Sequence, residues 1–395
     1  MSINSQQQGR VALPDLLRAA ALMGIIVVNA VGFSWPLEEG YKTGAIQTPL
    51  DAAADISMAG LFMFKAYPLF SMMFGAGLAF QIGAAERANA AFGPRYCRRL
   101  GALFVLGVLH FTFFWIGDIL MVYALLGALL YAVKDLPIKR LVNLGVTLII
   151  INTAILAALA ALIWLGETFA PDDMPSPDDI AEMTVATHLA FGEGTFWQAA
   201  LHRLSLLSGA LIGGLIQQGL GVFGFFCFGL AAVKAGAITD PTHKIWTRSR
   251  HLFLPIGLVL SFLGAYFYHR SESVLSSEMF LGLAIMMAAS PFSAMGYAGL
   301  IAKASIGTLG PIRRFFAKAG SASLTAYLLQ SLILSLVFTA YGFGQFATLN
   351  AALITIIAVI AGLASLILTG IWRSFASRGP MEALLRRFTY WGTSR

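Results

Sequence analysis

Charged residues are scarce in this sequence. Only 11% of its 395 residues are Asp, Glu, Lys or Arg, whereas a soluble domain carries about 25%. Hydrophobic residues make up 58% of the chain, and the mean hydropathy is +0.78. So few charges leave too little polar surface for a soluble enzyme, and so many apolar residues exclude a disordered chain. The composition therefore indicates a polytopic membrane protein.

Cysteine is nearly absent, and the motifs of soluble enzymes are missing. The two cysteines, Cys97 and Cys227, exclude a disulfide framework or a cysteine metal cluster, and their apolar surroundings predict free, buried thiols. We find no phosphate-binding glycine loop with lysine, no histidine pair at metal-ligand spacing and no serine elbow. We therefore expect neither a metal site nor a tightly bound cofactor. Gly75 and Gly77 in the segment FGAGLAF are interpreted as packing glycines.

Long apolar runs dominate the chain. A spanning helix needs roughly 20 mostly apolar residues, and about ten runs meet that condition. These runs are 12–33, 67–84, 100–116, 118–133, 141–165, 205–233, 251–268, 279–300, 321–341 and 349–372. They predict an all-α transmembrane bundle, organised as a single integral-membrane domain over residues 1–395. Residues 51–66 are interpreted as a short interfacial or re-entrant helix that ends near Pro68, because proline interrupts helical hydrogen bonding.

Positive and negative charges fall on opposite sides of these runs. Alternate connections hold 22 of the 26 Lys and Arg residues, and the other connections hold 14 of the 19 Asp and Glu residues. Basic loops are cytoplasmic in most membrane proteins, so both termini are predicted to be cytoplasmic. The acidic segment 167–200 is then an extracytoplasmic loop, with one short helix around 178–191. The basic segment 373–395 is a cytoplasmic tail, and the net charge of +7 requires no nucleic acid.

Ionisable groups inside a bilayer are costly, so each is a candidate functional residue. In the first span, Asp15, Arg18 and Asn29 share one helical stripe, and Arg18 lies about 16 Å from Asn29 along the axis. This stripe is interpreted either as a polar conduit or as an Asp15–Arg18 pair with Asn29 bonded to a neighbouring helix.

The third span carries a histidine in its outer half. His110 is a candidate general base, because imidazole accepts protons near neutral pH. Asp118 opens the next span and orients the imidazole if the chain turns sharply between them, since on one straight helix they would be about 12 Å apart. The alternative is a structural histidine that donates to a backbone carbonyl.

Three further polar residues are candidates for a substrate path. Lys65 precedes the second span, and its alternative role is to reach the outer interface with its ammonium group. Tyr327 and Gln330 share a face of the ninth span with Ser323, and hydrogen bonding between helices is their alternative role. His188, on the acidic loop, is expected to be solvated.

Four blocks of the chain carry a resemblance. They are PDLLRAAALMGIIVVNAVGF (14–33), FKAYPLFSMMFGAGLAF (64–80), RRLGALFVLGVLHFTFFWIGDILMVYALLG (98–127), and SASLTAYLLQSLI (321–333) with RGPMEALLRRFTYW (378–391). With these blocks the chain resembles the YeiB family of bacterial polytopic membrane proteins. The resemblance implies a multi-pass protein of the bacterial inner membrane.

That family is similar in turn to the transmembrane acyltransferases, which move an acyl group from cytoplasmic acyl-CoA to an acceptor at or across the membrane. The similarity implies acyl-CoA, such as acetyl-CoA, as donor and an acceptor that the sequence does not identify. Arg18 with Arg98 or Arg99 would hold the CoA phosphates. Asn29 would donate to the thioester oxyanion, and His110 would accept the acceptor's proton.

The first helix departs from the acyltransferase pattern at one position. The acyltransferase-three group has histidine where this chain has Asn29. The lysosomal heparan-glucosaminide acetyltransferases are similar there, with arginine and asparagine, and use a histidine shortly after. Residues 30–50 of this chain contain no histidine, and Glu38 and Glu39 stand there instead. His110 is therefore the imidazole that the chain offers for this chemistry.

A second interpretation uses the same polar residues. In a transporter or permease for a small organic molecule, the stripe from Asp15 to Asn29 would line a permeation path. The sequence leaves open whether the protein forms a homodimer in the bilayer.

Overall fold

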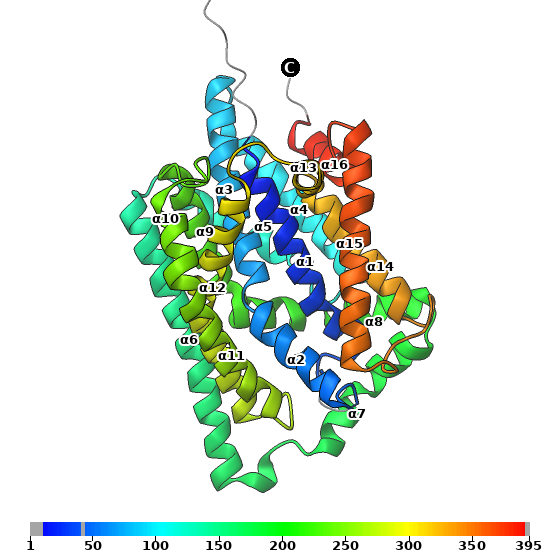
Figure 1. The fold of residues 1–395 in the computed structure, drawn as a ribbon. Coiled ribbons are helices and arrows are strands. Elements are labelled where there is room, and N and C mark those ends of the chain that lie inside the picture. Colours follow the sequence, from blue (N-terminus) through cyan, green and yellow to red (C-terminus); the bar gives the residue numbers. More distant parts are fainter. Residues whose placement is uncertain (1–10, 41–43, 392–395) are drawn as a thin grey trace, which may run out of the picture.

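The computed structural model describes residues 11–40 and 44–391, and its regular elements within these ranges are all helices (Figure 1). The all-α class predicted from the sequence is therefore confirmed. Arg10, Lys42 and Arg395, which contribute to the predicted charge asymmetry, lie outside the described residues, as does the end of the basic 373–395 segment.

The first half of the chain forms these helices: α1 (Leu13–Ser34), α2 (Pro49–Leu61), α3 (Ala66–Arg87), α4 (Phe92–Phe113), α5 (Leu120–Ala132), α6 (Ile138–Phe169), α7 (Pro177–His188) and α8 (Phe196–Gly214). The second half forms α9 (Leu220–Lys234), α10 (Lys244–Arg248), α11 (Leu254–Arg270), α12 (Ser277–Ala304), α13 (Pro311–Gly320), α14 (Ser323–Phe338), α15 (Ala351–Phe375) and α16 (Pro380–Thr389). Short 3-10 or π turns join some of them: η1 (Pro171–Asp173), η2 (Leu189–Glu193), η3 (Leu215–Gly219) and η4 (Ser249–Phe253).

Each of the ten predicted apolar runs falls on helical structure, and the predicted short helix of the acidic segment corresponds to α7. In the part of the chain described, seven helical stretches are long and apolar enough to cross a membrane. The number is eight if α13 and α14, which are bent by 83°, form one span. α5 has only 13 residues, and α4 carries arginines in its first half. The count of ten spans and the side of each terminus stay predictions.

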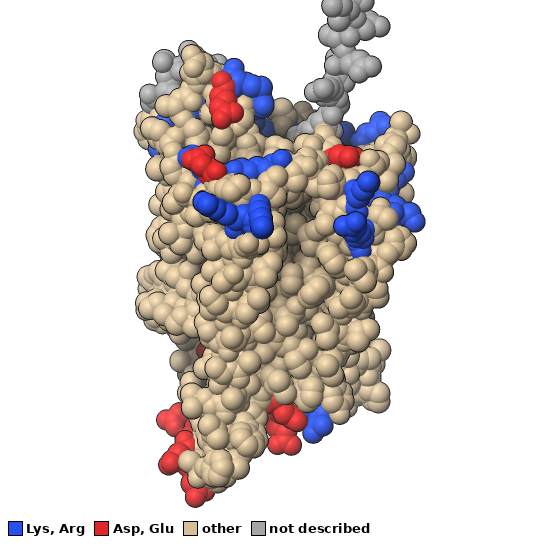
Figure 2. Space-filling view, turned by 90° about the vertical axis from the view of Figure 1, so that its left-hand side faces the viewer, with Lys and Arg blue, Asp and Glu red and all other residues tan. Residues whose placement is uncertain are grey.

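Charge separates the two ends of the bundle. The basic end holds α10, α13 and α16, and the acidic end holds α7 and the connection between α11 and α12 (Figure 1). Figure 2 shows most Lys and Arg gathered near one end of the molecule with a few Asp and Glu among them, mainly Asp and Glu at the other end, and a largely uncharged band between the two ends. This distribution is that of a multi-pass membrane protein whose apolar band faces lipid.

α1 forms the centre of the bundle. It is apolar on nearly all sides, as is typical of a helix surrounded by protein, and it packs against α3, α13, α14 and α15. Asp15 and Arg18 are therefore presented from a buried helix at the basic end rather than from the lipid-facing surface (Figure 1).

α3 approaches α9 closely on one side and leaves space on the other. A Cβ atom on Gly75 would lie 2.1 Å from the backbone oxygen of Phe226, so only glycine permits this contact. This confirms Gly75 as a packing residue. A Cβ on Gly77 would meet only the Gln81 side chain, at 3.9 Å. Gly77 faces a cavity instead of a neighbouring helix.

The predicted helix before the second span is present as α2, but the break after it lies at residues 62–65. Pro68 sits in the first turn of α3, where its missing N–H breaks no helical hydrogen bond. Lys65 is fully buried and donates to the carbonyl of Ala59 over 2.9 Å. The alternative that Lys65 reaches the interface is wrong, because its ammonium group is bonded to the buried carbonyl of Ala59 near the end of α2.

The two cysteines differ in their surroundings. Cys227 is buried as expected, whereas Cys97 is exposed. The expectation of a buried thiol is wrong for Cys97, because α4 turns its neighbour Tyr96 toward the core instead.

Candidate functional site

His110 and Asp118 are brought together by a sharp turn between α4 and α5. The Nδ1 atom of His110 lies 2.7 Å from Oδ2 of Asp118. The other carboxylate oxygen, Oδ1, accepts a hydrogen bond from the backbone N–H of Met121 over 3.0 Å. Both oxygens of Asp118 are thus engaged, one by the start of α5 and one by the imidazole. The sharp turn that the sequence required for this pair is present.

The pair is enclosed by protein. His110 is 2% exposed and Asp118 8% exposed. In the tautomer that donates Nδ1–H to the carboxylate, the free electron pair of the ring is on Nε2. That Nε2 atom is buried and has no hydrogen-bond partner among the described residues. The imidazole is oriented through Nδ1 by a carboxylate rather than by a backbone carbonyl, and its other nitrogen is available to accept a proton.

Tyr327 lies beside both the imidazole and a cavity. Its ring lies 5.1 Å from the His110 ring, measured between centroids, and it is itself a wall of the cavity. We call this space the inner cavity; its volume is about 240 Å³. Arg99 and Leu103 of α4 also line it, and with His110 they occupy positions i, i+4 and i+11, which share one face of a helix. The cavity therefore follows α4 toward His110.

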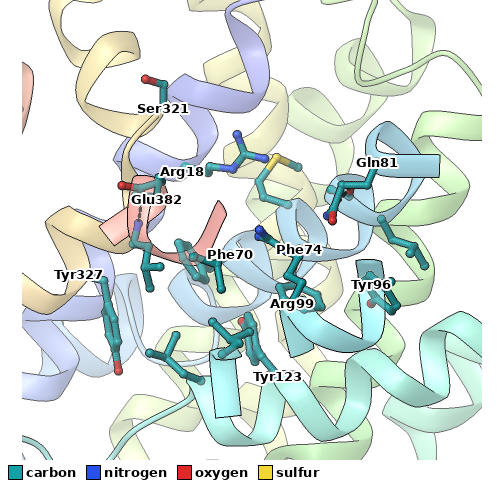
Figure 3. A pocket seen from close by; sticks show the side chains of 18 residues that line it. Arg18, Phe70, Phe74, Gln81, Tyr96, Arg99, Tyr123, Ser321, Tyr327 and Glu382 are labelled. Carbon is teal, nitrogen blue, oxygen red and sulfur yellow. Dashed lines mark hydrogen bonds between the residues drawn. The ribbon is translucent and has the colours of Figure 1, made fainter. Parts of the chain in front are cut away.

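A second, wider space continues from the inner cavity at the basic end. We call it the mouth cavity, and its volume is about 640 Å³. The two cavities share the following wall residues: Arg18, Gly77, Gln81, Arg99, Ser321 and Glu382. In Figure 3 the side chains of Arg18 and Arg99 extend into this common space, with Tyr327 at its far side. Together the cavities form a path from the basic end toward the His110–Asp118 pair.

Positive charge dominates the mouth cavity. The cationic residues in its wall are five arginines: Arg18, Arg99, Arg373, Arg378 and Arg386. Two carboxylates line it as well, Asp15 and Glu382. Arg18 donates to Asp15 over 2.9 Å, so the intrahelical pair considered from the sequence is present, and both of its members face the cavity.

The three arginines proposed for phosphate binding do not all reach the cavity. Arg18 and Arg99 line both spaces, and the Nε atom of Arg99 is buried without a hydrogen-bond partner among the described residues. Arg98 lines neither cavity, and its Nε donates to the carbonyl of Thr389 over 3.1 Å. In this structure Arg98 fastens α16 to α4.

Glu382 is a site residue that the sequence did not indicate. Its Oε1 accepts from the backbone N–H groups of Leu324 and Thr325, at 2.7 and 3.2 Å, and its Oε2 accepts from the Thr325 hydroxyl at 2.6 Å. Ala322, the N-cap of α14, offers no side-chain oxygen, so Glu382 of α16 caps α14 instead. Its position in the C-terminal block of the family resemblance was the one available signal.

The remaining predicted residues lie away from the cavities. Asn29 is half-buried on α1 and lines neither space. Gln330 donates to the carbonyl of Leu22 over 3.3 Å, which is the interhelical hydrogen bond considered as its alternative role. Lys65 is bonded to Ala59. The roles proposed for these three residues stay predictions.

The acidic end has its own buried polar contacts. His188 lies 2.9 Å from Oε1 of Glu39, which also accepts from the Thr184 hydroxyl over 2.6 Å. His188 keeps 39% of its side chain exposed, so it is partly solvated as expected, and it also bonds to the segment after α1. The first turn of α7 is closed by Asp179, whose pKa is lowered by hydrogen bonds from Ser176.

Comparisons with known proteins find similar proteins in bacteria. Residues 232–392 match the family described as "Protein of unknown function (DUF418)". The chain is 26% identical to "Uncharacterized protein YeiB" of Escherichia coli (strain K12), over 95% of each chain. The predicted resemblance to the YeiB family is confirmed. The chain is also 27% identical to "Uncharacterized protein YxaH" of Bacillus subtilis (strain 168), over 96% of this chain and 94% of that protein.

Both relatives match this chain along nearly their whole length. No solved structure matches the chain.

Proposed function

We propose that this multi-pass protein is an acyltransferase of the bacterial inner membrane, which moves an acyl group from acyl-CoA to an acceptor at or across the membrane. The observation that carries the proposal is the buried His110–Asp118 pair. The pair contacts Tyr327, which lines the inner cavity, and the inner cavity continues into the mouth cavity, whose wall holds five arginines. The positive charge at one end and the unpartnered Nε2 near the other match the two ends of an acyl-CoA molecule.

The dimensions of the path favour a long, thin donor. Arg99 and His110 are eleven residues apart on one helix, which is about 16 Å along its axis. A thioester carried on a slender arm would cover this distance while its phosphates stay at the mouth. Aromatic and aliphatic side chains form the wall between, including Phe70, Phe74 and Leu103, and they would exclude water from the thioester.

In the proposed reaction the imidazole takes up one proton and later gives it back. Asp118 holds Nδ1–H, so Nε2 accepts the proton of an acceptor hydroxyl or amine as that group attacks the thioester carbonyl. The new bond joins the acceptor's oxygen or nitrogen to the acyl carbon. The carbon–sulfur bond then breaks, and the CoA thiolate takes the proton from His110. For this transfer the wall near Tyr327 must rearrange, because Tyr327 lines the inner cavity and His110 does not.

The test is acyl transfer by the purified protein in nanodiscs, followed as release of the CoA thiol from acetyl-CoA in the presence of membrane extract as a source of acceptor. We expect His110→Gln to lower the rate by about 10²–10⁴-fold, the usual contribution of a general base. CoA affinity should be unchanged. The matched control is His251→Gln, because His251 is an exposed histidine of η4 that lines neither cavity.

Two results would count against the proposal. Full activity of His110→Gln would remove the imidazole from the reaction. Absence of thiol release from the wild-type protein, together with CoA-independent uptake of a small solute by vesicles that contain it, would favour the permease alternative, in which the same cavities form one half of a permeation path.

A further inference from the structure

Among the described residues, the wall of the mouth cavity carries more positive than negative charge. Its five arginines come from α1, α4, the end of α15, the segment 376–379 and α16. Of the two carboxylates beside them, Asp15 is bonded to Arg18, and Glu382 caps α14. The wall therefore carries an excess of three positive charges. Charges near a membrane are retained where they have a partner, so the cavity is suited to an anion.

The chemical type of these cationic side chains indicates which class of anion the cavity binds. Every cationic residue in the wall of the mouth cavity is an arginine. A guanidinium group is planar and donates two parallel hydrogen bonds to a phosphate, whereas an ammonium group acts as a point charge. Hydroxyl groups of Ser321, Ser377 and Thr239 also line the cavity, and hydroxyl groups are common donors to phosphate oxygens.

The C-terminal part of this wall is firmly held. The guanidinium group of Arg386 lies 4.3 Å from the centre of the Tyr390 ring, and that of Arg95 lies 5.1 Å from the same ring. Arg373 donates from Nε to the Ser321 hydroxyl over 2.9 Å. With Arg98 and Glu382 also binding α16 to its neighbours, these side chains are positioned before any ligand arrives.

We propose that the mouth cavity binds a ligand with two or more phosphate groups, and that Arg373, Arg378 and Arg386, here called the C-terminal arginines, recognise them. An excess of three positive charges exceeds what one phosphate group neutralises, since a phosphate monoester carries about two negative charges at neutral pH. The inference deepens the proposed function and rests on it for the choice of CoA as the first probe. A free nucleotide such as CoA and the headgroup of cardiolipin share this chemistry.

The experiment measures binding rather than turnover. Full-length protein is placed in nanodiscs of phosphatidylcholine alone, and CoA binding is measured by calorimetry. In a second arm, nanodiscs that also contain cardiolipin are analysed by native mass spectrometry for retained lipid. The test variants are Arg386→Gln and Arg378→Gln, and the control is Arg387→Gln, because Arg387 is the exposed neighbour on α16 that does not line the cavity.

We expect each test variant to weaken binding of the anion about tenfold or more, as for loss of one charge-assisted hydrogen bond, and the control to bind as wild type. Loss of CoA binding identifies a free nucleotide, and loss of cardiolipin retention identifies a lipid headgroup. Arg378→Gln serves as a second test variant in case Arg386→Gln unfolds α16, because Arg378 lies before that helix. Equal binding by wild type, test variants and control overturns the inference, as does binding of neither anion. If binding is present without thiol release, the proposed acyl transfer fails while this inference stands.

Discussion

At the scale of single residues, Glu382 joins the stability of the fold to the shape of the site. Its carboxylate accepts three hydrogen bonds from the start of α14, and α14 carries Tyr327 one turn later. Moving Glu382 would therefore move the side chain that lines the inner cavity and contacts His110.

Replacing Glu382 by alanine should destabilise the protein by about 1–2 kcal/mol, because the first N–H groups of α14 lose their cap. The measurement is the thermal unfolding midpoint in a fixed detergent. Glu86→Ala is the control, since Glu86 is exposed near the end of α3. Equal midpoints for the two variants would show that the cap contributes nothing.

The sequence predicted one half of the site at this scale and missed the other. His110 and Asp118 are eight residues apart, so a single turn was enough to predict their contact. Glu382 and Leu324 are 58 residues apart, and nothing in the local pattern pairs them. Likewise, Arg98 and Arg99 are neighbours in sequence but have different surroundings. Arg99 lines the cavity, whereas Arg98 binds the carbonyl of Thr389 on α16.

At the scale of helices, α3 sets the width of the path. Its Gly75 side is closed by α9, and its Gly77 side opens into both cavities. The segment FGAGLAF thus provides a packing contact and a binding surface within one turn.

Gly77→Leu should fill the common space and weaken CoA binding strongly. It should not lower the unfolding midpoint, because a Cβ there meets only the movable Gln81 side chain and leucine is a better helix former than glycine by about 0.8–1 kcal/mol. Gly101→Leu on α4 is the matched control, since a Cβ at that exposed position meets nothing within 4 Å. Calorimetry with CoA distinguishes them. Wild-type affinity in Gly77→Leu would mean that the ligand does not occupy this path.

Helices themselves were the most predictable feature, because a bilayer demands long apolar runs and those runs are visible in the sequence. Their interruptions were less predictable. Proline suggested a break at Pro68, yet the chain breaks at residues 62–65, where Phe64 adopts a left-handed backbone conformation with φ of 57° and Lys65 binds the end of α2. The position of the break between α2 and α3 therefore depends on tertiary contacts, which the sequence pattern does not show.

At the scale of the whole molecule, the separation of charge predicts which side of the membrane each end occupies. We expect the basic end to face the cytoplasm. Cys97 is exposed, so labelling starts from a Cys97→Ser background. In intact cells a membrane-impermeant maleimide should react with Glu182→Cys and not with Lys244→Cys, since both positions are exposed but lie at opposite ends. The reverse result would invert the orientation and place the mouth cavity outside.

The cavities could not be predicted from the sequence, although their charges could. The basic segment 373–395 was predicted as a cytoplasmic tail, yet three of its arginines line the mouth cavity: Arg373 at the end of α15, Arg378 in the segment 376–379, and Arg386 on α16. Residues of α1 and α16 lie together in the wall of the mouth cavity, and no sequence pattern within either helix predicts this contact.

The place of α16 at the end of the chain fixes the order of events during biosynthesis. Chains fold as they are made, beginning from the N-terminus, so α1 to α15 enter the membrane while the C-terminal wall is still in the ribosome. A nascent or truncated chain that ends before Pro380 has His110 and Asp118 but lacks Glu382 and Arg386. The His110–Asp118 pair is therefore made before the wall of the mouth cavity is complete, and the anion site proposed above would be complete only once α16 is in place.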